Sequence, residues 1–296
     1  MNRSKGFRIL VALAALVLVL VAAFSYLRLW VPAWGSTAEE RGRAMPGDEQ
    51  VSPPLMVSWT HGITIRAAPE AVWPWIVQMG DVRGGFYSYT FIENFIAPEQ
   101  YRNAERILPE LQNPVPGTAM IGEVLRMREI QPNRHLLAAF DLPEVKMSWV
   151  WALYPTGPQR TRLVVRLRGR AEVEAQGLLL SVGSFFVNFG GFVMERRMMQ
   201  GIKDRAEGRI EPPWYQGAEI ACWLAAFGLG LAAAVAYVGR RAWWRGLAAG
   251  LGATLVLLWL TFGQPPLWVR LVLLLLLIAG AAWAFRSPRM PRKARR

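Results

Sequence analysis

The chain has 296 residues, of which 53% are hydrophobic, and its formal net charge is +13. This charge does not indicate nucleic-acid binding, because residues 31–217 hold 20 acidic and 20 basic side chains and the surplus lies in the hydrophobic flanks. Two histidines and one cysteine, Cys222, offer neither a metal-ligand set nor an intramolecular disulfide. No phosphate-binding or nucleophile motif appears, so we expect no metal and no cofactor.

The first apolar segment, residues 9–23, is predicted to cross a membrane, and we assign residues 1–31 to an N-terminal transmembrane anchor. Trp30 and Trp34 suit a membrane–water interface. The alternative is a cleaved signal peptide, since Ser36 and Ala38 form a small-x-small pattern behind this segment. Residues 32–56 are rich in glycine, proline and charge, which predicts a linker.

Residues 57–66 alternate between apolar and polar side chains, which predicts a half-buried strand whose inner face carries one polar residue, His61. Residues 67–79 change to helical spacing. Pro69 suits the first helical position, Gly80 ends the helix, and Pro74 is expected to kink or shorten it. The aromatic-rich residues 81–97 are predicted to form a loop and a short helix.

Four further segments, residues 119–130, 134–142, 145–154 and 161–173, are predicted to be successive antiparallel strands. Trp149 and Trp151 share the apolar face of the third. In the fourth, the apolar face lies opposite a row of arginines, namely Arg162, Arg166, Arg168 and Arg170. A sheet of this kind needs a packing partner on its apolar face only.

That partner is predicted to be a long helix over residues 184–207. Phe192 belongs to its apolar stripe, whereas Glu195, Arg196 and Arg197 are expected on a solvated face. The element order predicts an α+β domain over residues 57–210, in which a curved antiparallel sheet surrounds the C-terminal helix.

Residues 218–286 contain apolar segments at 218–238, 247–262 and 267–285, which predict a three-helix transmembrane block. Basic clusters flank the spans, and the last forms a tail at residues 287–296. The positive-inside rule assigns these clusters to the cytoplasm, so both termini are expected inside and the α+β domain outside a cell membrane. Gly246 and Gly250 form a GxxxG pattern, which suggests close helix packing and a membrane-helix partner besides the lipid bilayer.

Four sequence runs resemble a known family: AAPEAVWPWIVQMG at residues 67–80, RGGFYSY at 83–89, LPELQ at 108–112 and FVMERRMMQGIK at 192–203. Over about residues 57–208 the chain resembles the START-like (SRPBCC) superfamily, specifically bacterial members described as polyketide cyclase/dehydrase or lipid-transport proteins. The resemblance implies a helix-grip fold with an elongated apolar cavity between sheet and long helix, which takes a lipid, polyketide, sterol or other hydrophobic molecule. It brings no shared catalytic set.

The residues expected at this cavity are His61, Met79, Asp81, Phe86, Tyr87, Tyr89, Trp149, Trp151 and Phe192. Several have a second interpretation. His61 and the two tryptophans also suit an ordinary core, and Asp81 also suits a turn. The tyrosines combine an apolar body with a hydroxyl group that can orient a ligand.

Three functions remain as alternatives. We favour a membrane-tethered domain that binds a lipid or other hydrophobic small molecule, without enzymatic activity. The second is a cyclase or dehydratase in which Asp81, His61 and Tyr87 act as acid and base. The third is a non-catalytic sensory or scaffolding membrane protein.

Overall fold

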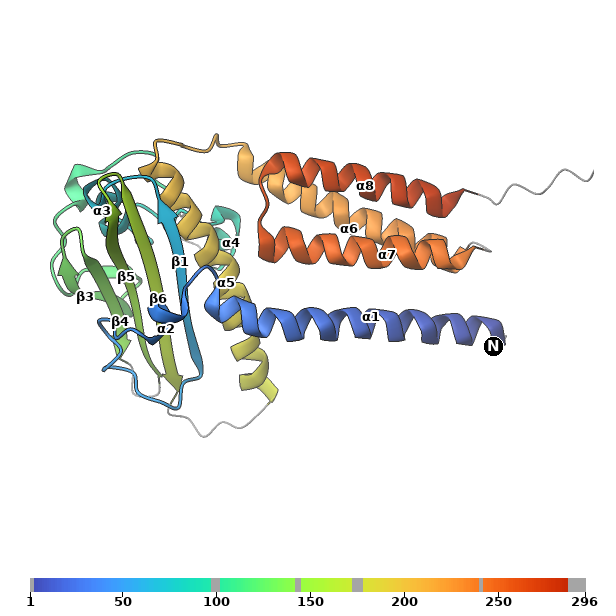
Figure 1. Ribbon diagram of the computed structural model, residues 1–296, viewed down its shortest axis with the longest axis horizontal. Coiled ribbons are helices and arrows are strands. Elements are labelled where there is room, and N and C mark those ends of the chain that lie inside the picture. Colours follow the sequence, from blue (N-terminus) through green and yellow to red (C-terminus); the bar gives the residue numbers. More distant parts are fainter. Residues whose placement is uncertain (1–2, 97–101, 142–144, 172–177, 240–241, 287–296) are drawn as a thin grey trace, which may run out of the picture. The chain divides into compact units, whose positions relative to one another are not determined.

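The computed structural model describes residues 3–96, 102–141, 145–171, 178–239 and 242–286. The chain forms two compact units (Figure 1). The first comprises Met1–Tyr26 and Pro212–Arg296, and we name it the helical unit. The second comprises Leu27–Glu211, and we name it the grip unit.

The grip unit contains a six-stranded sheet in which all neighbouring strands are antiparallel. The strands lie in the order β1-β6-β5-β4-β3-β2. Their bounds are β1 Val57–Ile65, β2 Ala119–Ile121, β3 Leu125–Gln131, β4 His135–Asp141, β5 Val145–Gly157 and β6 Arg160–Ala171. The strand predicted over residues 119–130 is therefore two strands, because Gly122 adopts a φ of 48° and starts a turn.

Helices α3 (Pro69–Val77) and α5 (Leu178–Ala206) pack against each other and against the sheet (Figure 1). The short helices α4 (Thr90–Ile96) and η2 (Pro109–Leu111) lie in the connection between α3 and β2. Pro74 falls inside α3, which is only nine residues long. The α+β, helix-grip architecture predicted from the sequence is confirmed.

The main core lies between the inner face of the sheet and helices α3 and α5, and it is rich in methionine. Five methionines of this core are at most 1% exposed: Met79, Met120, Met127, Met198 and Met199. Methionine side chains are unbranched and flexible, so such a core repacks more readily than one of branched residues.

Residues 31–52 cross the edge strand β1 and cover the outer face of the sheet, and we name them the strap. The strap contains the helices η1 (Val31–Ala33) and α2 (Ala38–Gly42). At the crossing, the N–H of Gly62 donates to the carbonyl of Trp34, which satisfies an edge group of the sheet. Gly35 has a φ of 65° there, and a Cβ at this position would collide with the Gly62 carbonyl.

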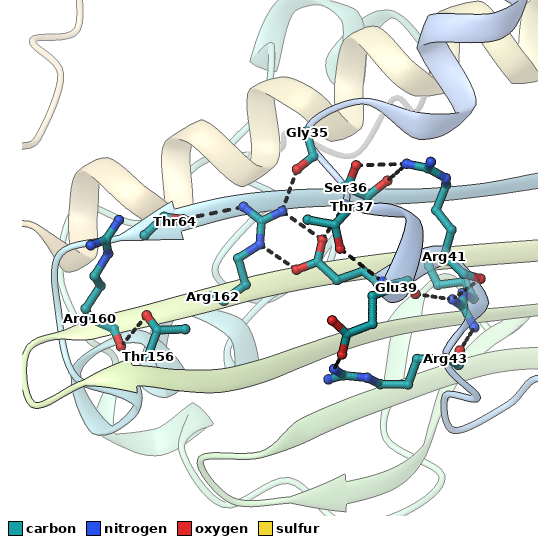
Figure 2. A network of polar contacts seen from close by, with 12 residues as sticks. Gly35, Ser36, Thr37, Glu39, Arg41, Arg43, Thr64, Thr156, Arg160 and Arg162 are labelled. Carbon is teal, nitrogen blue, oxygen red and sulfur yellow. Dashed lines mark hydrogen bonds and ion pairs between the residues drawn. The ribbon is translucent and has the colours of Figure 1, made fainter.

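Arginines of β6 bind the strap to the outer face. Arg162 forms two hydrogen bonds to the carboxylate of Glu40, at 2.7 and 2.9 Å, and also donates to the Gly35 carbonyl and to Thr64 (Figure 2). The outer face is therefore covered as well as the inner one.

Arg166 is 3% exposed, and its guanidinium group makes five hydrogen bonds. The acceptors are Thr60, the carboxylate of Asp48 and the carbonyls of Arg43, Glu40 and Arg41. The prediction of a linker over residues 32–56 was wrong, because its acidic and carbonyl groups pair with arginines that were expected to face solvent.

The helical unit holds α6 (Tyr215–Gly239), α7 (Trp243–Leu258), the π-helical turn η3 (Trp259–Gly263), α8 (Leu267–Phe285) and the first residues of α1 (Arg3–Trp30). Among the described residues, four helical segments are long and apolar enough to cross a membrane, as predicted. The third runs over 21 residues because η3 extends α7. Arg240, Arg241 and the basic tail at 287–296, on which the predicted sidedness depends, lie outside the described residues.

The GxxxG residues of α7 pack against α6 of the same chain. A Cβ at Gly246 would collide with the backbone of Tyr237, and one at Gly250 would lie 3.9 Å from Cβ of Ala233. A partner helix at these glycines would therefore have to displace α6. A buried ion pair that the sequence did not reveal also joins α6 to α8: Arg270 donates to Glu219 at 2.6 Å.

Candidate functional site

The strand register brings the predicted inner-face residues into two adjacent rows across the sheet. One row contains His61, Val165, Trp151 and Leu136. The next contains Trp59, Leu167, Trp149 and Ala138. The candidate site is the space between these rows and the facing side of α5.

His61 is fully buried, and both of its ring nitrogens face acceptors. Nδ1 lies 2.5 Å from Oε1 of Glu195, and Nε2 lies 2.7 Å from the carbonyl oxygen of Val31. A carbonyl oxygen only accepts, so Nε2 donates to Val31, and Nδ1 forms a short hydrogen bond with Glu195. The indole of Trp59 donates to both oxygens of Glu195 at 2.9 Å.

The prediction that residues 195–197 form a solvated face was wrong. Glu195 is 2% exposed and Arg197 is 5% exposed. Arg197 pairs with Glu211, and Arg196 lies over the rings of Trp30 and Trp34. Burial lowers the pKa of Arg196 to about 10. The helical pattern could not reveal this, because the strap and the loop before α4 cover this side of α5.

Phe192 is fully buried on α5 and contacts both Trp30 and Trp34. Its ring centroid lies 5.3 Å from that of Trp30 and 6.0 Å from that of Trp34. Both tryptophans are half-buried and lie at the end of the first apolar helical segment, so their place at a membrane interface stays a prediction. Met79, another predicted site residue, belongs to the main core.

Trp149 and Trp151 lie side by side, with ring centroids 4.4 Å apart. Phe86 lies nearly parallel to Trp149, with an interplanar angle of 13° and centroids 6.3 Å apart. Trp151 is fully buried and Trp149 is half-buried. The indole nitrogen atoms of both are inaccessible to solvent and have no hydrogen-bond partner in the described part of the chain.

Tyr87 is held at the other end of α5. Its hydroxyl group donates to the carbonyl of Trp75 at 3.0 Å, and its ring lies under the guanidinium group of Arg205. Burial raises the pKa of the Tyr87 hydroxyl. Tyr89 is buried as well, and Arg197 lies over its ring at 5.3 Å.

Asp81 has the turn role that was its alternative interpretation. Its carboxylate accepts hydrogen bonds from the backbone N–H groups of Val82, at 2.7 Å, and Gly122, at 2.5 Å. It thereby joins the loop after α3 to the turn between β2 and β3.

The structure does not bring Asp81, His61 and Tyr87 together as one acid/base group. His61 contacts α5 at residue 195, whereas Tyr87 contacts α5 at residue 205. Ten residues of α-helix span about 15 Å. The polar atoms of the three side chains also bond to different partners.

Glu93 on α4 was not singled out from the sequence. It is 7% exposed, and neither carboxylate oxygen has a hydrogen-bond partner among the described residues. Burial raises its pKa to about 7. The sequence offered only a weak signal that Glu93 is buried. That signal is a single acid between aromatic residues of a short amphipathic helix.

A separate surface pocket of about 640 Å³ lies at the ends of β3, β4 and β5. Its lining is mixed, with several prolines beside polar residues such as Glu70, Arg134 and His135, and it includes none of the nine predicted site residues. His135 pairs there with Glu129 at 2.9 Å.

No protein-family model matches the sequence, and no curated protein matches it. Among solved structures, the chain is similar to a START superfamily protein from Mycobacterium smegmatis, at 12% identity and a TM-score of 0.28, over 51% of this chain and 97% of that chain. It is also similar to the Zhui aromatase/cyclase from Streptomyces sp. R1128, at 19% identity and a TM-score of 0.31, over 52% of this chain and 96% of that chain. Protein MLL2253 from Mesorhizobium loti matches at 14% identity and a TM-score of 0.29, over 52% of this chain and all of that chain.

Proposed function

We propose that the protein binds a lipid or another hydrophobic small molecule in the interior of the grip unit, while its apolar helices hold it in a membrane. The observation that carries this proposal is the composition of the interior. Five buried methionines and the aromatic residues Phe86, Trp149 and Trp151 occupy the space between sheet and helices. Flexible methionine side chains allow this core to open around an apolar ligand and to close again in its absence.

The charged groups of the interior support binding rather than catalysis. His61 and Glu195 are buried and paired with each other, and their remaining polar atoms are bonded to Val31 and Trp59. A general acid or base must reach the proton that it transfers, and these groups face protein partners only. Because Tyr87 is also distant along α5, the geometry does not favour an acid/base enzyme that uses Asp81, His61 and Tyr87.

The proposal includes a membrane location with the grip unit on the extracytoplasmic side, as the positive-inside rule predicts for the basic flanks. The strap supports tethering without a long flexible linker, since its contacts with β1 begin at Val31, within the first apolar helical segment. At the other end, Glu211 pairs with Arg197, and only Pro212, Pro213 and Trp214 precede α6. A domain held in this way exchanges ligand close to the bilayer and does not travel freely.

Extraction of the purified full-length protein with organic solvent, followed by mass spectrometry, tests the proposal. We expect an apolar compound enriched above its abundance in the host membrane. Ala138→Leu, on the inner face beside Trp149, should reduce the amount. Ala139→Leu, its neighbour on the outer face, is the matched control and should not. An extract with the composition of bulk membrane lipid for the wild type would overturn the proposal.

A further inference from the structure

The two indole N–H groups on the inner face of β5 are the starting point. Three tryptophans of the two inner-face rows differ in one respect. Trp59 donates to Glu195, whereas Trp149 and Trp151 have no acceptor within the described residues. A buried donor without a partner costs about 1–3 kcal/mol, and proteins leave few such groups.

Among the described residues, the acceptors known to lie at the two inner-face rows are already bonded. The carboxylate of Glu195 already accepts from Trp59 and His61, and the Val31 carbonyl accepts from His61. The adjoining row positions, Val165, Leu167, Leu136 and Ala138, are apolar. The acceptors of these rows therefore leave both indole N–H groups available to an oxygen of a ligand.

The surrounding charges indicate that this oxygen is neutral. Two N–H donors favour an acceptor, but a buried anion would also require a counter-ion. The described cations of the neighbouring α5 segment are engaged elsewhere: Arg196 lies over Trp30 and Trp34, and Arg197 pairs with Glu211. A carbonyl oxygen accepts two hydrogen bonds and carries no charge.

The aromatic walls favour a flat molecule. Trp149 and Trp151 are adjacent rings with an interplanar angle of 38°, and Phe86 lies parallel to Trp149 on another element. Ring faces of this kind gain contact area with planar ligands at little cost in side-chain entropy.

We infer that the ligand is a neutral, planar and largely apolar molecule with a carbonyl oxygen, and that this oxygen accepts hydrogen bonds from Nε1 of Trp149 and Trp151. This inference rests on the proposed function and adds the chemistry of one end of the ligand. It assigns to the two tryptophans a role in specificity that the core interpretation does not contain.

Equilibrium dialysis of the full-length protein with 9-fluorenone and with fluorene tests the inference, because these planar molecules differ by one carbonyl oxygen. Each affinity is corrected for partition into protein-free detergent micelles. We expect the wild type to bind fluorenone at least about tenfold more tightly, which corresponds to about 1.4 kcal/mol. In the Trp149→Phe/Trp151→Phe double variant this ratio should fall to about one, with fluorene binding retained.

Arg168→Met is the control, since this side chain lies on the outer face of the sheet and pairs with Asp48 of the strap. Its ratio between the two probes should remain that of the wild type. Equal binding of both probes by the wild type, or an unchanged ratio in the double variant, would overturn the inference and leave the proposed function standing. Failure of both probes to bind would overturn the proposed function and this inference together.

Discussion

Buried polar groups on the two faces of the sheet in the grip unit differ in whether they have hydrogen-bond partners. On the outer face, Arg166 is buried and makes five hydrogen bonds to the strap and to β1. On the inner face, Trp149 and Trp151 bury their N–H groups without an acceptor in the described residues. The outer face is completed by the chain itself, whereas the inner face is completed, on our account, by a ligand.

This difference distinguishes buried polar groups that stabilise the fold from buried polar groups that select a ligand. The strap and β6 form a closed set of donors and acceptors, so a substitution there should lower stability and leave ligand chemistry unchanged. The inner-face donors contribute little to stability, and their substitution should alter ligand selection. The predictions below test this separation.

The largest effect is expected for Arg166→Met. The substitution leaves Asp48 and three carbonyl groups without their buried donor, which should lower the free energy of unfolding by about 3–5 kcal/mol. Chemical denaturation of the full-length protein in detergent measures it. Arg168→Met is the control, because that side chain is 25% exposed and reaches Asp48 at only 3.2 Å. Equal effects for the two would contradict a special role for Arg166.

Glu195→Gln should lower the free energy of unfolding by about 2–3 kcal/mol. The amide still accepts from Trp59, but it replaces the carboxyl group that lies 2.5 Å from Nδ1 of His61. A double-mutant cycle with His61→Gln isolates this pair, and we expect the two effects to be strongly non-additive. Additive effects would show that the 2.5 Å contact is not a coupled pair.

Trp59→Phe should destabilise the protein by about 1.5–3 kcal/mol more than Trp151→Phe does. Both substitutions remove the same atoms from buried rings, but only the first breaks a hydrogen bond to a carboxylate. Thermal unfolding of the two variants without added ligand provides the comparison. If Trp151→Phe destabilises the protein as much as Trp59→Phe does, the N–H of Trp151 has a hydrogen-bond partner and the prediction is wrong.

The smallest effect is expected for Glu93→Gln and depends on pH. Burial raises the pKa of the folded-state carboxyl group to about 7 from an ordinary value of 4.5, so the folded protein binds more protons between these values. The contribution of Glu93 to stability is therefore present at acidic pH and is lost as pH rises through about 7. Glu93→Gln should remove this pH dependence and raise the melting temperature at pH 8 by about 2–4 °C. An identical pH profile for both proteins would refute it.

The elements that follow from local pattern were predictable. Alternation in residues 57–66 predicted β1, helical spacing predicted α3 and α5, and apolar length predicted the four candidate spans. The resemblance to START-like proteins supplied the arrangement of these elements. Residues on the inner strand faces, such as Trp149 and Trp151, could be selected because a period of two fixes their side.

The missed features depend on contacts between residues far apart in sequence. Glu195 lies 134 positions from its partner His61, and Arg166 lies 118 positions from Asp48. Local pattern indicated a solvated helix face for Glu195. It indicated a linker for the segment that contains Asp48. Only the folded chain shows that an acid in a polar-looking linker matches an arginine on a strand.

The most direct test of the central claim compares the ligand content of a variant of the inner face with that of a variant of the outer face. Organic extracts of the full-length wild type, Trp149→Phe/Trp151→Phe and Arg168→Met are analysed by mass spectrometry after identical purification. Our account predicts an enriched neutral, carbonyl-bearing apolar compound in the wild type and in Arg168→Met, and its depletion in the inner-face variant. Extracts of all three proteins that match bulk membrane lipid would contradict it.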